Sequence, residues 1–328
     1  MKAYVIKQAG GPEVLELREI ASVTPKSDEV RIRVRAFGLN RAETYLRAGK
    51  MGPIADARVP GIEAVGEVLE DPSGTFRVGR RVATAMGGLQ FSRHGSYAEE
   101  VTVLRSNVID LDGNTLSWEE LAALPQAYLT IWGALNHSLN IQAKQTLLVR
   151  GATSTVGLAA VTYAKASGLQ VVATTRSGDH AKQLYRVGAD HVVVDSGSVA
   201  DEVRKLYPAG VDAALEVVGA STLRDTASTL RPFGAVTVIG LLGGAPVLDQ
   251  FNLMADLPPA VRLSFFPSQL LGTAALPLDK SPLRNIADDV AAKRLPSLLK
   301  QTLEFDEVRR AHELIEGNQV QGKLVIRV

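Results

Sequence analysis

The chain contains no cysteine among its 328 residues. This absence excludes disulfides, thiolate nucleophiles and every zinc site that needs sulfur ligands. Histidine is also scarce, and no two of the five form an HxxxH or HxH pair: they are His94, His137, His180, His191 and His312. Metal catalysis is therefore not expected, and we predict no metal ligand.

Excess charge and long apolar runs are also missing. The net charge of +1 argues against a nucleic-acid or acidic-membrane partner, which usually requires a strong basic excess. No apolar segment approaches the roughly 18 residues of a membrane span, and Met1 and Lys2 lead directly into a strand-like run without signal-peptide architecture. We expect a cytoplasmic globular protein, and at this length two domains.

The first third of the chain alternates short strand-like runs with glycine, proline and aspartate. Residues 31–36 alternate polar and apolar side chains with period two, as in a half-buried strand. Many short strands with frequent turns are typical of a barrel or sandwich. The predicted strands are 2–6, 14–19, 29–37, 64–70, 81–85 and 98–103.

The pattern changes at Ser117, where the spacing to Glu120 is that of a capping box and predicts a helix start. From Gln145 onward, strands alternate with helices, which indicates a doubly wound parallel sheet. A final strand over 323–328 is expected to return to the first domain. The predicted strands are 145–149, 170–174, 191–194, 211–217, 235–239 and 261–265; the helices are 157–167, 180–187, 198–206, 220–230, 283–292 and 306–316.

A glycine-rich turn links the first of these later strands to the next helix: Gly151, Ala152, Thr153, Ser154, Thr155, Val156 and Gly157. Amides at a helix start are unpaired and lie at the positive end of the helix dipole. We predict that these seven residues hold the pyrophosphate of a dinucleotide. Ser154 stands where a central glycine is usual, and we expect it to offer its amide and its hydroxyl as donors.

The end of the following strand reads Thr175, Arg176 and Ser177. An enzyme that prefers the non-phosphorylated cofactor places an acid here, on the ribose 2′-hydroxyl. This chain instead has a guanidinium between two hydroxyls, a set that suits a 2′-phosphate. The three residues therefore predict NADPH as the cofactor, although a solvated surface arginine is the alternative.

Further segments follow one another in an order that runs nearly from end to end: GLNRAETYLRAG at 38–49, PGIEAVG at 60–66, HGSYAE at 94–99, ALPQAYLTIWG at 123–133, GAD at 188–190, AHELIE at 311–316 and GKLV at 322–325. With these motifs and the loop at 151–157, the chain resembles the medium-chain dehydrogenase/reductase superfamily, specifically its zinc-free quinone oxidoreductase (zeta-crystallin-like) branch. The resemblance implies an α/β protein with two domains. A GroES-like β-rich catalytic domain (1–117 and 266–328) is interrupted by a doubly wound Rossmann domain that binds NADPH (118–265).

The resemblance also implies roles for individual residues. Zinc-dependent relatives carry cysteine where Asn40 stands and histidine where Ile62 stands, together with a four-cysteine lobe that is absent here. Tyr45 is expected in the substrate cleft, and it and Asn40 are the catalytic candidates. Further cofactor contacts are expected from Asn40, Thr130, Val217, Val218, Gly219, Ile239, Gly240, Leu241 and Lys323. Three plainer roles stay open: Asn40 as the cap of a helix over 41–47, Tyr45 as a core aromatic, and Glu63 as a structural partner instead of an acid catalyst.

The function implied is hydride transfer from NADPH to a quinone or another α,β-unsaturated carbonyl compound, with Tyr45 as a donor to the developing oxyanion. Two alternatives are an enoyl-thioester or enone reductase that requires Tyr45 as its acid, and an NADPH-binding protein without turnover. The strand at 260–265 is expected at a sheet edge, where pairing with a second copy would give a homodimer.

Overall fold

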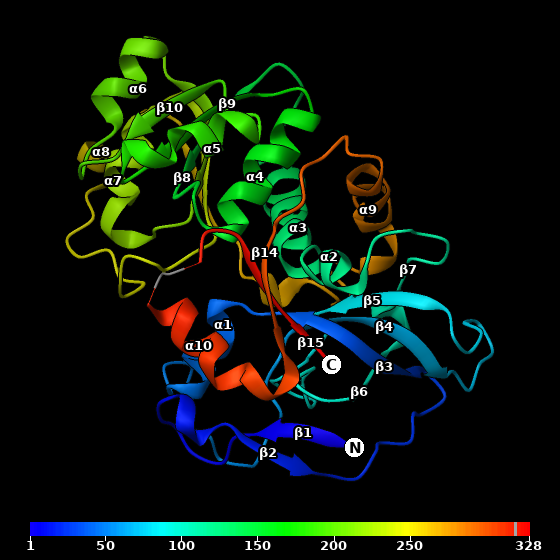
Figure 1. The fold of residues 1–328 in the computed structure, drawn as a ribbon. Helices are drawn as coiled ribbons and strands as arrows, with labels where there is room; N and C mark the ends of the chain where they lie inside the picture. Colours follow the sequence, from blue (N-terminus) through cyan, green and yellow to red (C-terminus); the bar gives the residue numbers. More distant parts are fainter. Residues whose placement is uncertain (318–319) are drawn as a thin grey trace. The chain divides into compact units, whose positions relative to one another are not determined.

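The computed structural model describes residues 1–317 and 320–328 and separates into two compact units (Figure 1). The first unit comprises residues 1–129 and 269–328, and the second comprises residues 130–268. The boundary falls inside helix α3 (Pro125–Trp132). The sequence-based domain boundaries at 117/118 and 265/266 stay a prediction.

The first unit is built on a seven-stranded sheet. Its last strand runs antiparallel to β3, with Val325 opposite Gly38, so the predicted return of the C-terminal strand is confirmed. One of its strands, β14, was not expected, because its sequence LKQTLE has little apolar character. The order is β14 (Leu299–Glu304), β15 (Lys323–Arg327), β3 (Glu29–Gly38), β4 (Glu63–Glu70), β5 (Arg81–Ala85) and β7 (Ile109–Asp110), with β6 (Glu100–Leu104) also paired to β3.

A separate pair, β1 (Lys2–Val5) and β2 (Glu16–Glu19), packs beside this sheet in the first unit. The predicted period of two in β3 is confirmed, since Val30, Ile32 and Val34 are buried and Arg33 is exposed. The core also contains Phe37, whose ring stacks on another buried aromatic ring, Tyr97, with centroids 4.6 Å apart.

The helices of the first unit are α1 (Arg41–Arg47), α2 (Trp118–Ala122), α9 (Leu283–Ala291) and α10 (Val308–Glu316). The predicted capping box at the start of α2 is confirmed: the Glu120 amide donates to the Ser117 hydroxyl (3.2 Å), and the Ser117 amide donates to the Glu120 carboxylate (3.0 Å). Short 3-10 helices occupy Pro12–Val14, Arg105–Asn107, Leu278–Lys280 and Phe305–Glu307.

The second unit is a six-stranded sheet in which all neighbouring pairs are parallel. Its order, β10-β9-β8-β11-β12-β13, reverses direction at β8, as in a doubly wound dinucleotide fold. The predicted edge position of β13 is confirmed. The strands are β8 (Thr146–Arg150), β9 (Gln170–Thr175), β10 (His191–Val194), β11 (Val211–Glu216), β12 (Leu230–Val238) and β13 (Arg262–Phe265).

The helices of the second unit alternate with these strands: α4 (Thr155–Ala166), α5 (Ala181–Arg186), α6 (Ala200–Leu206), α7 (Ala220–Ser228) and α8 (Leu253–Asp256). A π-helical turn, Gly133–Ser138, continues α3, and a 3-10 turn, Gly178–His180, precedes α5. Among the residues described, we find no helix with the length and apolar character needed to cross a membrane.

Candidate functional site

The loop Gly151–Gly157 joins the carboxyl end of β8 to the first turn of α4. Gly151 has a φ of +84°, a conformation that favours glycine. A Cβ on Gly157 would collide with the carbonyl oxygen of Gly151, so only glycine lets α4 start this close to the strand. The predicted phosphate loop therefore has the tight strand-to-helix geometry that a pyrophosphate needs.

Ser154 forms the N-cap of α4. Its hydroxyl donates to the Gly151 carbonyl (2.8 Å) and accepts from the Gly157 amide (3.1 Å), and its own amide also donates to Gly151 (3.2 Å). The expectation that its hydroxyl and amide offer donors to a phosphate is therefore corrected, because both are used inside the loop. Ser154 therefore shapes the loop. The backbone amide of Val156 lies in the first turn of α4, where no helix carbonyl is available as its acceptor, so this amide is a candidate donor to a phosphate.

Two further predicted segments lie on the same edge of the sheet. The Val217 amide donates to the Arg150 carbonyl (3.1 Å), and the Ile239 amide donates to the Glu216 carbonyl (2.9 Å), so the ends of β8, β11 and β12 are adjacent. A Cβ on Gly240 would collide with the Val217 carbonyl oxygen. The predicted segments Val217–Gly219 and Ile239–Leu241 are thus brought together beside the phosphate loop.

The end of β9 carries the residues predicted for the 2′-phosphate. Thr175 is buried; its hydroxyl donates to the Ser177 carbonyl (3.0 Å), and the Ser177 hydroxyl donates to Asp179 (2.9 Å). The two hydroxyls therefore shape the turn. Arg176 is exposed and makes no hydrogen bond or ion pair with the residues that the structure describes. Of the three predicted residues, its guanidinium is the group available to a phosphate.

The first unit contains a buried polar cluster that joins α1, β4 and β15. The Lys323 ammonium donates to Glu63 Oε1 (2.5 Å) and to Asn40 Oδ1 (2.6 Å). Glu63 Oε2 accepts from the backbone amide of Gln126 (2.8 Å), and Glu43 accepts from the backbone amide of Asn40 (2.8 Å). Glu43, Glu63 and Lys323 are each at most 1% exposed. The expectation that Glu63 is a structural partner agrees with its ion pair to Lys323.

Both hydrogens of the Asn40 side-chain amide are used in hydrogen bonds. Its Nδ2 donates to Glu63 Oε1 (2.8 Å) and, over a longer 3.3 Å, to Glu43 Oε1, while its Oδ1 accepts from Lys323. An amide nitrogen has two hydrogens and an amide oxygen two lone pairs. Asn40 can therefore offer a ligand one lone pair and no hydrogen, which makes it a hydrogen-bond acceptor in this arrangement.

Asn40 is the N-cap residue of α1, as the helix-cap alternative proposed. Glu43 belongs to the same capping box, because its carboxylate accepts from the backbone amide of Asn40 (2.8 Å). Burial of Glu43 raises its pKa to about 7, and the nearby Glu63 adds to the rise, whereas Lys323 opposes it. Glu43 was not among the predicted site residues. The capping-box spacing could have indicated its bond to Asn40, but not its burial.

These donors do not fit the catalytic zinc of zinc-dependent relatives. Position 62 is an apolar isoleucine, Asn40 is held by Lys323, and the Glu63 carboxylate already binds an ammonium. Zinc prefers cysteine, histidine and unengaged carboxylates. Within the described ranges, no three His, Asp or Glu side chains are grouped as a metal site would require.

Tyr45 and Thr130 complete the predicted set, each in its own unit. Tyr45, on α1, is partly exposed rather than buried in the core, and its hydroxyl makes no hydrogen bond with the described residues. The Lys50 ammonium lies 5.5 Å from the centre of its ring. Thr130, on α3, is 7% exposed. The hydroxyl of Tyr45 is thus available to donate.

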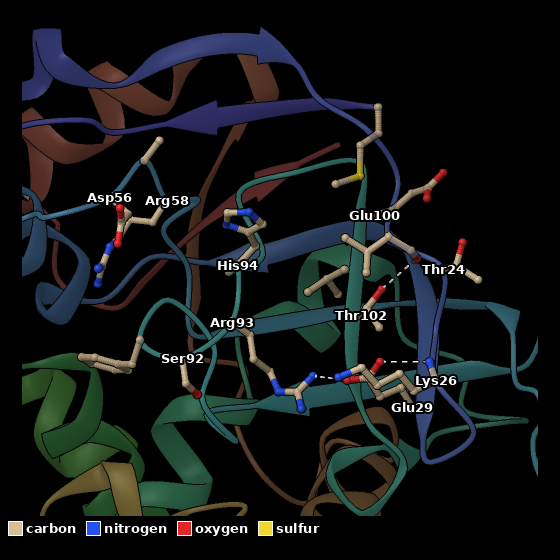
Figure 2. Close-up of a pocket in the computed structure, with 16 residues that line it drawn as sticks. Thr24, Lys26, Glu29, Asp56, Arg58, Ser92, Arg93, His94, Glu100 and Thr102 are labelled. Carbon is tan, nitrogen blue, oxygen red and sulfur yellow. Dashed lines mark hydrogen bonds and ion pairs between the residues drawn. The ribbon is translucent and has the colours of Figure 1, made fainter.

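A surface cavity of about 640 Å³ lies in the first unit, between the loop at 56–58, the loop at 91–95 and the strand β6. Figure 2 shows the residues that line it. Charges of both signs line it, and one pair is closed, with Arg93 donating to Glu29 (2.7 Å). The residues predicted for cofactor or substrate do not line it. The cavity therefore does not define the candidate site.

Comparisons with known proteins match both halves of this description. The chain matches the alcohol dehydrogenase GroES-like domain over residues 26–113 and the domain described as zinc-binding dehydrogenase over residues 155–273. The first match confirms the expected GroES-like character of the β-rich unit. The second is a match to the domain, and the donor set around Asn40 still does not fit a zinc ion.

Individual proteins are similar over their whole length. Human quinone oxidoreductase is 30% identical, over 99% of this chain and 97% of its own. The 2-haloacrylate reductase of a Burkholderia species is 28% identical, over 99% and 98%. A mycobacterial protein solved in complex with NADPH is 26% identical with a TM-score of 0.87, over all of both chains. The chain therefore belongs to the medium-chain dehydrogenase/reductase superfamily, in its quinone oxidoreductase (zeta-crystallin-like) branch.

Proposed function

We propose that this protein is a zinc-independent, NADPH-dependent reductase of quinones or other α,β-unsaturated carbonyl compounds. The observation that carries the proposal is the carboxyl edge of the parallel sheet, where a helix-opening glycine loop lies one strand away from the unpaired guanidinium of Arg176. Backbone donors for a pyrophosphate and a free cation for a third phosphate are the features that an NADPH site needs. The relative bound to NADPH supports this choice of cofactor.

When bound, NADPH supplies a hydride. Gly151–Gly157 would hold the pyrophosphate, and Arg176 would hold the 2′-phosphate. The segments Val217–Gly219 and Ile239–Leu241 would contact the part of the cofactor nearest the strand ends. Asn40 and Thr130 would approach the nicotinamide, and Lys323 is a further proposed cofactor contact. Asn40 would accept a hydrogen bond there, because Glu63 and Glu43 already take both hydrogens of its amide.

The proposed substrate class depends on which groups of the site could assist the reaction. Among the described residues the cluster around Asn40 contains no metal-binding set, and its two carboxyl groups are buried and already hydrogen-bonded, so it favours a substrate whose negative charge is stable after hydride addition, such as a quinol oxyanion. The names of two relatives support the class: one is a quinone oxidoreductase, and the other reduces 2-haloacrylate, an α,β-unsaturated acid.

A panel assay tests the proposal. The purified protein is mixed with NADPH and, separately, with simple quinones, enones and an enoyl thioester, and loss of reduced nicotinamide absorbance is followed. We expect turnover with at least one quinone or enone, and no loss of activity after dialysis against a metal chelator. Thermal stabilisation by NADPH without turnover on any acceptor would instead identify a binding protein.

The free hydroxyl of Tyr45 favours a second candidate, an enone or enoyl-thioester reductase in which Tyr45 is a required acid. Such substrates develop a more basic oxyanion or carbanion than quinones do. The two candidates can be separated by removing the Tyr45 hydroxyl and measuring which class of substrate loses the most activity.

We further propose a homodimer formed through β13. This edge strand exposes Leu263 and Phe265, and α8, in the same unit, exposes Leu253 and Met254. An unpaired strand with exposed apolar side chains is a template for pairing with a second copy. Sedimentation should give a dimer, and replacing Leu263 and Phe265 by lysine should give a monomer; an unchanged dimer would contradict pairing at this edge.

A further inference from the structure

Arg150 is the last residue of β8 and is fully buried immediately before the phosphate loop. Its Nε and Nη2 donate to the two carboxylate oxygens of Asp195 (2.9 and 3.0 Å). Its Nη1 donates to Asp225 (2.5 Å) and to the Thr226 hydroxyl (3.1 Å). Further bonds go to the carbonyls of Gly197 and Thr222. The guanidinium has five N–H groups, and these acceptors use all of its nitrogens.

A buried cation next to an expected phosphate site would ordinarily be read as a phosphate ligand. Arg150 cannot have that role, because its side chain is 0% exposed and its donors are engaged by two carboxylates. Its effect on a cofactor must therefore pass through its partners. Of these, Asp225 lies on α7, where it also accepts from the Val199 amide (2.8 Å), whereas Asp195 lies directly after β10.

Asp195 and Arg176 each follow the last residue of two adjacent parallel strands, β10 and β9. Val194 is opposite Thr175 in the register of β10 and β9, and the Asp195 amide donates to the Thr175 carbonyl (2.7 Å). The next residues along the two chains, Asp195 and Arg176, therefore leave the sheet at the same carboxyl edge. A carboxylate free at this place would pair with Arg176 or accept from a ribose 2′-hydroxyl, and each contact favours the cofactor without the 2′-phosphate.

We propose that Arg150 determines the cofactor preference by holding the Asp195 carboxylate in a two-pronged ion pair, which leaves the Arg176 guanidinium free for a 2′-phosphate. The inference rests on the proposed NADPH dependence and adds to it a residue that touches no cofactor. Arg150 is thus a positioning residue, and the bidentate geometry matters because a single contact would let the carboxylate rotate toward Arg176.

The test measures the dissociation constants of NADPH and NADH for Arg150→Leu, Arg150→Lys and the double variant Arg150→Leu/Asp195→Asn. In Arg150→Leu, the released Asp195 should lower the preference for NADPH over NADH at least tenfold. Arg150→Lys keeps a buried cation without the two-pronged contact, so it should fold readily and lose about threefold of the preference. The double variant removes the released charge and should restore the preference to within about threefold of wild type.

Asp225→Asn is the matched control, because it removes the other carboxylate on Arg150, away from β9; the preference should not change. Equal loss of both cofactors in the Arg150 variants, or no restoration by Asp195→Asn, would overturn the inference and leave a purely structural role for Arg150. A wild-type protein without NADPH preference would overturn the proposed cofactor and this inference together. A wild-type preference that Arg150→Leu and Arg150→Lys leave unchanged would overturn the inference alone.

Discussion

The side chains of Lys323 and Asn40, which are 283 positions apart in the chain, meet in a hydrogen bond of 2.6 Å between Nζ and Oδ1. The contact joins the last strand to the start of α1, and Glu63 bonds to both residues. The cluster thus contains the buried carboxyl groups of Glu43 and Glu63, the buried ammonium of Lys323 and the side-chain amide of Asn40. A change of charge on one of these groups changes the electrostatic energy of the others.

Replacing Lys323 by methionine should be strongly destabilising. It leaves Glu63 buried without its cation, and breaking a buried ion pair costs about 3–5 kcal/mol. The free energy of unfolding, measured with urea at neutral pH, should fall by that amount and recover in part when Glu63→Gln is added. Lys300, exposed on β14, is the matched control, and Lys300→Met should change stability by less than about 0.5 kcal/mol.

Replacing Glu43 by glutamine should remove a pH dependence of stability. Its folded pKa of about 7 lies above the ordinary value of 4.5, so the folded state holds the proton more tightly than the unfolded state. Glu43 should therefore contribute a loss of stability as the pH rises from 4.5 to 7, at up to about 1.4 kcal/mol per unit, and this contribution then levels off. Urea unfolding at several pH values should show it as a pH-dependent difference in stability between wild type and Glu43→Gln. The difference between wild type and the exposed-site control Glu19→Gln should not fall in this way, and a difference between wild type and Glu43→Gln that grows as the pH rises would refute the assignment.

His312 should produce the opposite slope at acid pH. It is fully buried on α10, where its Nε2 bonds to the Tyr97 hydroxyl (3.1 Å). Burial, together with the nearby Arg47, lowers its pKa to about 3. Because the unfolded chain takes up the proton near pH 6.5, the contribution of His312 to stability should fall as the pH drops from 6.5 toward 3. The difference between wild type and His312→Leu should shrink over this window, whereas His94→Gln, at an exposed site, should follow wild type.

Arg176→Ala should weaken NADPH binding about 10- to 100-fold, since charge-assisted hydrogen bonds contribute roughly 1.5–3 kcal/mol each. NADH binding should change little, because the lost partner is the 2′-phosphate. Fluorescence titration with both cofactors checks the ratio. Lys205→Ala removes an equal charge from the exposed face of α6 and should leave the ratio unchanged. An unchanged ratio in Arg176→Ala would refute the 2′-phosphate assignment.

Tyr45→Phe separates the two substrate classes. If quinones are the substrates, kcat should change by less than about threefold, because a quinol oxyanion needs little help from an acid. With an enoyl thioester, loss of a required acid should lower kcat by about 10²- to 10⁴-fold. Steady-state kinetics on both classes, with the NADPH dissociation constant as the control for folding, decide between them.

Local chemistry explains which elements were predictable. The Ser117 capping box, the alternation in β3 and the apolar strands of the second unit are set by neighbours a few residues away, and the structure contains each of them. The strand β14 was missed because its sequence is polar and its pairing to β15 is a contact of the folded sheet. The N-cap role of Ser154 was missed although its partners, Gly151 and Gly157, are each three residues away, because its hydroxyl was assigned to a phosphate instead of to the loop itself.

The sequence by itself determined the class of the protein: the loop Gly151–Gly157 and the strand–helix alternation indicated a dinucleotide-binding fold, and the ordered motifs that resemble the quinone oxidoreductase branch implied a reductase. Only the tertiary structure decided how the charges are distributed. It buried Glu43 beside Glu63 and Lys323, and it paired Arg150 with Asp195 while leaving Arg176 free. The energy of a charge interaction depends on the distance between the two groups and on how deeply they are buried. For residues that are remote in sequence, both quantities are set only when the sheets assemble.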